Sequence, residues 1–163
     1  MGVEISPSEK GCVVSLNNPI SVFVSHLWSV DDDYLRVFEY LGSARNFYYK
    51  NTADPEQCVT GAIEAQREQL RTQINAAEVV LLLSAHHVKS AALIEFQANF
   101  AKSAKKPLVL LKNFGLEIPV PATLKAIADD VIDWNERSLV DALRRHARHE
   151  NTTRWDSIDY TTT

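Results

Sequence analysis

Glycine is scarce in this chain of 163 residues, and its spacing excludes two common nucleotide-binding motifs. The five glycines are Gly2, Gly11, Gly42, Gly61 and Gly115. They form neither the G-x-G-x-x-G of a Rossmann fold nor the glycine-rich pattern of a P-loop. A dinucleotide bound in the usual Rossmann way is therefore not expected. The G-x-S-x-G elbow is missing too, which argues against Ser25 as a hydrolase nucleophile.

Metal-ligand spacing is also lacking. The cysteines are Cys12 and Cys58, which are too far apart for a metal or redox motif and are expected to be reduced thiols. His86 and His87 are adjacent, and no cysteine or carboxylate cluster accompanies them. No metal site is predicted from these spacings.

Long apolar runs and an excess of positive charge are absent as well. The longest apolar run, Val79–Leu83, is far too short to cross a bilayer, and Met1–Lys10 is too polar for a signal peptide. We therefore expect a cytoplasmic protein with no membrane partner. The net charge of −4 argues against a nucleic-acid partner. The basic clusters Lys102–Lys106 and Arg144–Arg148 fall near predicted helix carboxyl termini, where cations complement the helix dipole.

What the chain does contain is an alternation of strand and helix patterns. Runs of β-branched and aliphatic residues predict strands, and apolar residues at helical spacing predict helices. The predicted strands are 20–25, 47–49, 79–83, 108–111 and 131–134, and the predicted helices are 31–44, 60–77, 91–104, 122–129 and 138–149. This order predicts a flavodoxin-like three-layer α/β sandwich: a five-stranded parallel sheet of order 2-1-3-4-5, with helices on both faces.

One domain is expected, over residues 19–149. Residues 1–18 are predicted to be an N-terminal arm or to hold a short extra strand at Cys12-Val13-Val14. Residues 150–163 show no periodic apolar face and are predicted to be a flexible tail.

A candidate binding site follows the first strand. Ser25 and His26 come directly after its buried run, and ligands of open α/β sheets bind at the carboxyl ends of the strands. Ser29-Val30-Asp31-Asp32 then provides a start signal for a helix. Tyr49 and Asn51 are placed at the end of the second predicted strand, where they could line the same pocket.

Several stretches resemble the bacterial TIR-like domain family, in the right order, from about Ile20 to Arg148. They are Val22-Phe23-Val24-Ser25-His26-x-Trp28, Phe47-Tyr48-Tyr49-Lys50-Asn51, Leu70-x-x-Gln73-Ile74-x-x-Ala77-Glu78-Val79-Val80-Leu81-Leu82-Leu83, Lys105-Lys106-Pro107-Leu108-Val109 and Val131-Ile132-Asp133-Trp134-Asn135-x-x-Ser138-Leu139-Val140-x-Ala142-Leu143. The branch that they resemble includes the TIR proteins of Thoeris antiphage defence systems.

The resemblance implies an NAD-consuming enzyme, an NAD+ glycohydrolase or ADP-ribosyl cyclase. Such an enzyme cleaves the nicotinamide glycosidic bond and makes a linear or cyclic ADP-ribose-derived signal, which activates a separate effector protein. NAD is then the substrate and no further cofactor is implied. Homo-oligomers are common among TIR-like enzymes.

The resemblance also implies a catalytic glutamate on the helix after the third strand, for which Glu95 is the candidate. The family usually reads Ser-x-Trp-x-x-x-Glu. Here Glu95 follows Ser90 by five positions, and Ala92 stands at the tryptophan position. Counting back from Pro107 instead places Gln97 where the glutamate belongs. A carboxylate suits the chemistry because departure of cationic nicotinamide leaves oxocarbenium character on the ribose.

The other candidate residues are assigned to substrate binding, each beside a simpler structural role. Ser25 and His26 would position NAD, although His26 could equally be a loop residue that satisfies backbone groups. A carboxylate beside His26 is expected to raise its pKa. Trp28 could stack on a ring, but packing against the first helix is favoured. Ser90 would line the pocket or cap its helix.

Two other functions stay open. The chain could be a non-catalytic TIR module that works by homotypic assembly. It could also be a nucleoside-processing enzyme of similar layout, such as a deoxyribosyltransferase.

Overall fold

The computed structural model of the protein describes residues 18–56, 62–115 and 119–148. Along the chain the elements are β1 (Ile20–Val24), α2 (Asp32–Ser43), β2 (Tyr49–Asn51), α3 (Ile63–Asn75), β3 (Val79–Leu83), α4 (Ser84–Lys89), α5 (Ala91–Ser103), β4 (Leu108–Leu111), α6 (Ala122–Ile127), β5 (Asp130–Ile132) and α7 (Glu136–Arg148). The strands form one parallel sheet of order β2-β1-β3-β4-β5. The predicted flavodoxin-like fold is confirmed.

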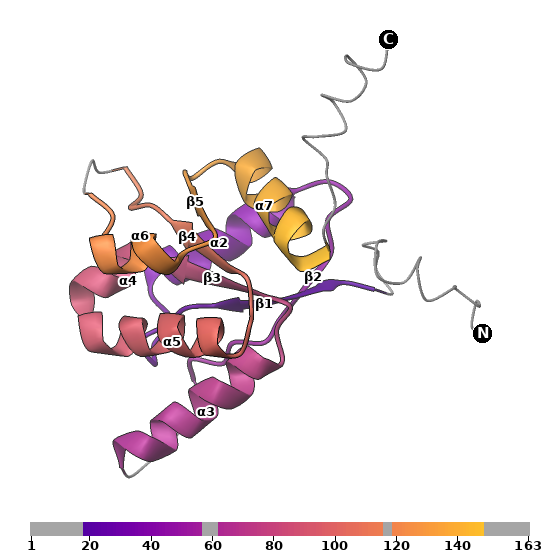
Figure 1. The fold of residues 1–163 in the computed structure, drawn as a ribbon. Coiled ribbons are helices and arrows are strands. Elements are labelled where there is room, and N and C mark those ends of the chain that lie inside the picture. The colour runs from indigo at the N-terminus through magenta and orange to yellow at the C-terminus, as the bar shows by residue number, and fades with distance from the viewer. Residues whose placement is uncertain (1–17, 57–61, 116–118, 149–163) are drawn as a thin grey trace, which may run out of the picture.

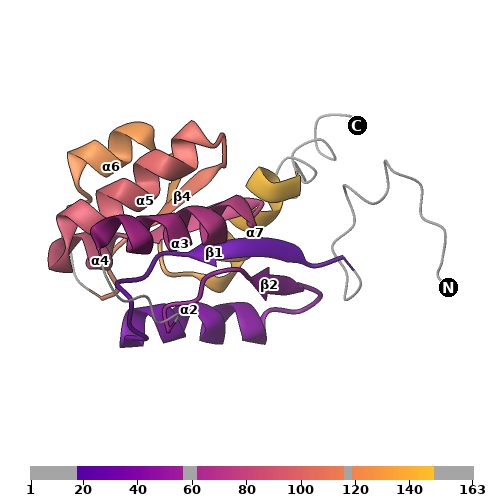
Figure 2. The same cartoon turned by 90° about the horizontal axis from the view of Figure 1, so that it is seen from below.

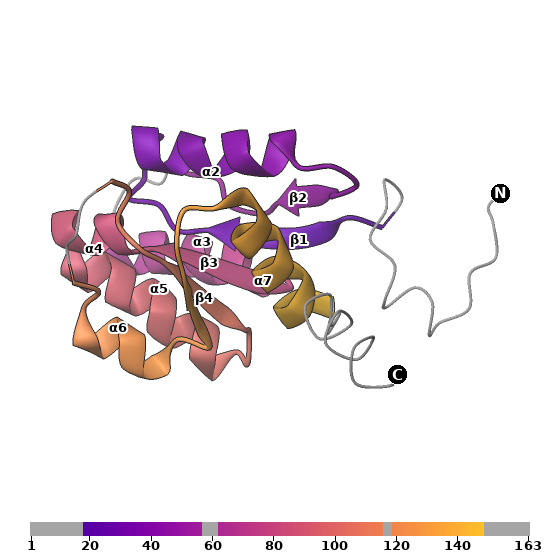
Figure 3. The ribbon, with the colours of Figure 1, turned by 90° about the horizontal axis from the view of Figure 1, so that it is seen from above.

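The helices form two layers around the sheet. Helices α2 and α7 cover one face, while α3, α5 and α6 cover the other (Figure 1 and Figure 3). Figure 2 shows α3 and α5 side by side on their face. This division follows from the right-handed crossover of parallel strands, because the chain reverses its direction across the sheet after β2. No helix in the described ranges is long and apolar enough to cross a membrane.

The core lies between these layers and is centred on β3 and β4. Every residue of both strands is buried, as expected for parallel strands that are covered on both faces. From the helices, Leu70 and Ile74 of α3 and Ile94 of α5 are fully buried on one side, and Leu143 of α7 is fully buried on the other. The long apolar run of β3 therefore serves as the centre of the core.

The strand register sets the carboxyl edge of the sheet, where the candidate site was expected. Val24 pairs with Leu81, Leu83 pairs with Leu111, and Leu111 pairs with Ile132. The residues that immediately follow β1, β3, β4 and β5 at this edge are Ser25, Ser84, Lys112 and Asp133.

One segment predicted to be a loop is a helix. Ala85–Lys89 was expected to connect β3 to the next helix, but Ser84–Lys89 forms α4, which Ser90 closes by donating its N–H to the carbonyl of His86 at 2.9 Å. The polar composition was misleading because His86 is fully buried and hydrogen-bonded, so polarity here does not mean exposure to solvent.

Two helix starts also differ from the prediction. Asp31, and not Ser29, is the N-cap of α2, and its carboxylate accepts the N–H of Tyr34 at 2.8 Å. At the start of α7, which was predicted to begin at Ser138, the side chain of Asn135 accepts the N–H of Ser138 at 3.0 Å, so Asn135 caps a helix that begins at Glu136. In both cases a side-chain oxygen of Asp or Asn is better placed than the serine hydroxyl to accept the free N–H groups of the first helical turn.

The second strand is shifted relative to its prediction. It was expected at 47–49 and lies at Tyr49–Asn51, where its register with Ile20–Val22 of β1 fixes it. The predicted strand at Cys12–Val14, Cys58 and the tail at 150–163 lie outside the described residues.

Candidate functional site

Ser25 lies at the carboxyl edge of β1, as predicted, but it is fully buried. Its Oγ accepts the N–H of Leu83 at 2.9 Å and lies 3.0 Å from Nδ1 of His86. On the other side of the imidazole, Nε2 of His86 lies 3.0 Å from a carboxylate oxygen of Asp31. A chain of side-chain hydrogen bonds therefore joins the end of β1 to α4 and to the start of α2.

The protonation of this chain follows from burial and charge. Burial lowers the pKa of His86, although the nearby Asp31 acts in the opposite direction. Burial alone would raise the pKa of Asp31, but the Tyr34 N–H, His86 and Lys89 outweigh it and lower that pKa. His86 is thus neutral with its proton on Nε2, which donates to ionised Asp31, and Ser25 donates its hydroxyl proton to Nδ1.

Ser25, His86 and Asp31 share the residue types of a hydrolase triad, but their arrangement does not present a nucleophile. The side chains of Ser25 and His86 are almost wholly inaccessible, and both hydrogen-bonding directions of the Ser25 hydroxyl are used within the protein. A nucleophile must face a position where a substrate carbonyl can sit. We assign these residues to fixing the carboxyl edge of the sheet.

His26 is buried in a neutral form, which corrects the expectation of a raised pKa. Its Nδ1 accepts the N–H of Trp28 at 3.1 Å, so Nε2 carries the proton and donates to Oε1 of Gln73 at 3.0 Å. Burial lowers the pKa of His26 to about 4 and outweighs the hydrogen bond to Gln73 and the charge of Asp54, which both act in the other direction. A protonated His26 that holds a phosphate does not fit this environment.

Trp28 packs beside His26 in a strained backbone conformation. The two rings meet edge to face, with their centroids 4.7 Å apart. Trp28 has a φ of 62°, which is unusual for a bulky side chain and carries a strain of about 1–3 kcal/mol. Its indole Nε1 is buried and has no hydrogen-bond partner in the described part of the chain.

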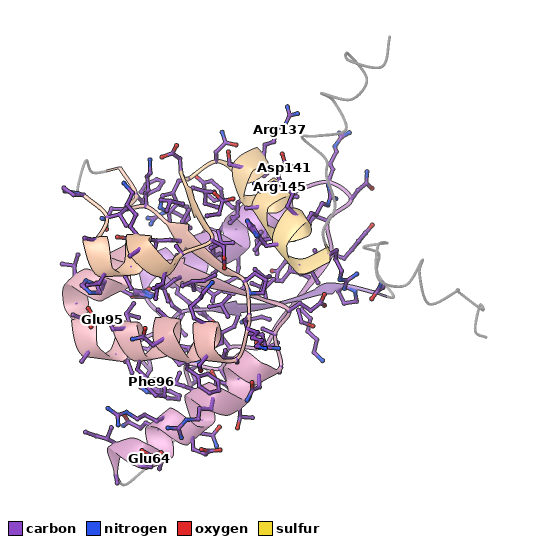
Figure 4. The ribbon with its side chains drawn as sticks, viewed as in Figure 1. Glu64, Glu95, Phe96, Arg137, Asp141 and Arg145 are labelled. Carbon is purple, nitrogen blue, oxygen red and sulfur yellow. The ribbon has the colours of Figure 1, made fainter. Side chains whose placement is uncertain are left out.

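Glu95, the predicted catalytic residue, does not approach Ser25 or His26. Its carboxylate lies 3.0 Å from Nε2 of His87 on α4 and 3.4 Å from the hydroxyl of Thr123 on α6. Its side chain is 41% exposed. Figure 4 shows Glu95 near the amino end of α5, at the outer side of the molecule.

Gln97 is the residue of α5 that reaches the end of β1. It is fully buried, and its Nε2 donates to the carbonyl oxygen of His26 at 2.8 Å. That contact fixes the orientation of the amide, so Oε1 points elsewhere and finds no hydrogen-bond donor among the described residues.

The remaining predicted site residues do not form one group with Glu95. Asn51 lies at the carboxyl end of β2, where its amide donates to the hydroxyl of Tyr34 at 2.9 Å. Tyr49 begins β2 instead of ending it, and packs against Phe38. Ser90 occupies the N-cap position of α5, but its side chain makes no capping hydrogen bond.

Sequence reasoning missed three residues that organise this edge: Asp31, Gln73 and His86. A signal existed for Asp31, because it directly precedes a helix and Asp is a favoured N-cap. Gln73 is a polar residue beside the apolar face of α3, and His86 was considered only as a metal ligand, so neither residue was predicted to be buried. Within the described ranges, no cluster of three or more His, Cys, Asp or Glu side chains could hold a metal ion.

Chemically, the edge around His26 offers neutral hydrogen-bonding groups. The unpartnered indole N–H of Trp28 is a donor, and the free Oε1 of Gln97 is an acceptor. Both residues touch His26, which is itself neutral. Two acids lie near this edge: Asp54 acts electrostatically on His26, and Asp31 already accepts hydrogen bonds from Tyr34, His86 and Lys89.

Comparison with known proteins adds little to this geometry. No family model and no curated protein matches the chain. A crystal structure of a Burkholderia pseudomallei protein, provisionally described as pilus assembly-related, is similar with a TM-score of 0.49 and 19% identity, over 90% of this chain and 95% of that one. An identity this low carries over no function, and the fold class rests on the strand order described above.

Proposed function

We propose that this chain is a TIR-like signalling module that acts by assembly with further copies of itself and does not cleave NAD. The observation that carries the proposal is the neutral amide of Gln97 at the carboxyl end of β1, combined with the position of Glu95 on another side of α5. The TIR-like character itself is supported by the ordered sequence motifs and agrees with the strand order.

The chemistry of NAD cleavage explains why this geometry favours a binding role. Loss of nicotinamide needs no acid, but the developing positive charge on the ribose needs a negative group close by. The Gln97 amide cannot supply that charge. Its Nε2 is also committed to the carbonyl of His26, which ties α5 to the end of β1.

A second candidate is the NAD-consuming activity that the resemblance implied, with Glu95 as the catalytic carboxylate and an ADP-ribose-derived product that acts on a separate effector. One observation favours it: the Glu95 carboxylate is partly exposed and is held in place by His87 and Thr123. A substrate ribose would then bind at the junction of α4, α5 and α6, away from Ser25 and His26.

The two candidates are separated by measuring nicotinamide release from NAD and self-association on the same preparation. The proposal expects nicotinamide release no greater than that of a protein-free blank, and a sedimentation coefficient that rises with protein concentration. The Glu95→Gln variant, which removes the charge but keeps the shape, should behave as the wild-type protein does in both measurements.

Three results would overturn the proposal. Nicotinamide release that disappears in Glu95→Gln would establish the second candidate. Release that survives Glu95→Gln but is lost in Gln97→Ala would place an active site at the end of β1. A constant monomer mass over the whole concentration range would remove the assembly role.

A further inference from the structure

A second cleft lies at the carboxyl ends of β4 and β5, away from His26. It has a volume of about 710 Å³, within the range of small-molecule sites. We call it the β4–β5 cleft. The lining residues used below are Lys112, Asn113, Phe114, Lys125, Asp133 and Trp134. Its position suits a ligand site, since open α/β sheets bind ligands outside the carboxyl ends of their strands.

Two aromatic rings form one wall of the β4–β5 cleft. The indole N–H of Trp134 donates to the carbonyl of Lys112 at 2.7 Å, and its ring meets Tyr40 edge to face at 5.4 Å. Phe114 stands perpendicular to Trp134, with ring centroids 5.5 Å apart, and is 42% exposed. The Trp134 ring is therefore held in place beside an exposed phenyl ring, which is an arrangement that can stack a planar ligand.

Positive charge surrounds these rings. The guanidinium carbon of Arg36 lies 4.1 Å from the centre of the Phe114 ring, and the charge of Arg36 is paired with Asp33 at 2.9 Å, so the free positive charge must come from the lysines. Lys112 and Lys125 line the cleft itself, and Lys112 lies 3.2 Å from Asp133, whose side chain is 74% exposed. Lys125 makes no ion pair with any residue of the described ranges. One acid thus faces two lysines at the cleft, and the balance favours an anion.

Asn113 adds a hydrogen-bond donor that the protein does not use. Its Nδ2 is buried, and it has no partner in the part of the chain that the structure describes. A buried amide N–H₂ without a partner is unfavourable, and an acceptor oxygen or ring nitrogen of a ligand in the cleft would relieve it.

We infer that the β4–β5 cleft binds a nucleoside phosphate. The base stacks on Phe114 beside the perpendicular ring of Trp134, the phosphate oxygens pair with Lys125 and Lys112, and Asn113 donates to an acceptor of the ligand. An acidic peptide would use the lysines but not the aromatic wall, and a neutral aromatic compound would use the wall but not the lysines. The β4–β5 cleft lies at the ends of other strands than the one that Gln97 contacts, so ligand binding there does not depend on the proposed function.

The test is titration calorimetry of the full chain with ADP, with adenosine and inorganic pyrophosphate as the two partial ligands. ADP should bind more tightly than either. Phe114→Ala should weaken ADP binding about tenfold, since stacking of a base on an aromatic side chain contributes on the order of 1–3 kcal/mol. Lys125→Ala should weaken it about fivefold at low salt, and by less at high salt.

Lys105→Ala is the matched control, because Lys105 is an exposed lysine that does not line this cleft and lies between α5 and β4. It should leave ADP affinity unchanged, and thermal melts of all three variants should show that they remain folded. The inference is overturned if ADP does not bind, or if Phe114→Ala and Lys125→Ala bind ADP as Lys105→Ala does. Equal affinity for ADP and pyrophosphate would overturn the recognition of a base.

Discussion

Two positions on one helix decide how the candidate site can work. Residues two apart on an α-helix point about 200° away from each other, so Glu95 and Gln97 cannot face the same group. The structure turns Gln97 toward His26 and Glu95 toward His87. Of these two residues, the one that reaches the end of β1 is therefore a neutral amide.

Gln97→Glu is expected to destabilise the protein by about 2–3 kcal/mol at neutral pH. It replaces a buried N–H donor with an ionised oxygen that faces the His26 carbonyl and leaves a buried charge unpaired. Asn99→Asp is the matched control, since it makes the same change at an exposed position of α5 and should have little effect. Urea unfolding measures both, and equal stability of the two variants would mean that the Gln97 contact contributes nothing.

His26 should make the protein less stable in mild acid. Its pKa is about 4 in the folded protein and near 6.5 in the unfolded chain, so the unfolded chain takes up the proton first as the pH falls. The free energy of unfolding is therefore highest above pH 6.5 and decreases as the pH falls from 6.5 to about 4. The total decrease due to His26 is about 3 kcal/mol. Urea unfolding at several pH values from 7.5 to 4.5 measures this loss.

The variant His26→Gln identifies the source of that pH dependence. A glutamine does not titrate, so the loss of stability in acid should become smaller. It should not vanish, because burial also lowers the pKa of His86. An unchanged pH dependence in His26→Gln would show that His26 is not the group responsible.

At the scale of elements, the start of α2 joins helix capping to the buried network. Asp31 caps the helix through the Tyr34 N–H and also accepts from His86 and Lys89. Asp31→Ala should reduce the free energy of unfolding by about 2–3 kcal/mol, because it removes a cap and leaves the buried His86 N–H unpaired. Ser29→Ala, two positions earlier and exposed, should change it by less than about 0.5 kcal/mol.

Chemical denaturation of Asp31→Ala and Ser29→Ala gives the comparison directly. If the two variants lost equal stability, the helix would depend on a start at Ser29, and the hydrogen bonds of Asp31 would be incidental. Asp31→Asn separates helix capping from charge pairing. An amide oxygen can still cap α2, but the amide carries no charge to pair with Lys89.

The long elements could be predicted from sequence, and the short ones could not. The continuous apolar run of β3 is long enough to identify a strand, and the apolar residues of α2 recur at helical spacing over several turns. The short helix α4 and the three-residue β2 depend on contacts with other parts of the chain. Ser25 and His26 could be placed at the correct edge because they follow a predictable strand. Their burial and their partners Gln73 and His86 could not be predicted, because these contacts join distant parts of the chain.

At the scale of the whole molecule, Arg148 connects helix α7 to the residues that precede strands β1 and β3. Its guanidinium donates to both carboxylate oxygens of Glu78, just before β3, and to the carbonyl of Pro19, just before β1. Glu78 in turn accepts the N–H of Ser21 at 3.1 Å. The Arg148 side chain is only 7% exposed, so this ion pair is largely shielded from water.

Arg148→Ala is expected to lower the free energy of unfolding by about 3 kcal/mol, because Glu78 keeps its charge in a partly buried position without its partner. Arg137→Ala, at an 81% exposed position of the same helix, is the matched control and should have an effect below about 1 kcal/mol. Thermal unfolding monitored by circular dichroism compares them. Similar midpoints for both variants would show that the Glu78–Arg148 pair does not hold α7 to the sheet.

The strand order was predictable because right-handed connections leave few arrangements for alternating strands and helices. It also has a consequence for synthesis on the ribosome. Of the five strands, β1 emerges first, but its neighbour β3 begins more than fifty residues later, so one edge of β1 stays unpaired until then. From β3 onward each new strand adds to a growing edge, β4 and then β5. Once Arg148 has left the exit tunnel, α7 can bind the residue that precedes β1, so this contact forms late in the synthesis of the described residues.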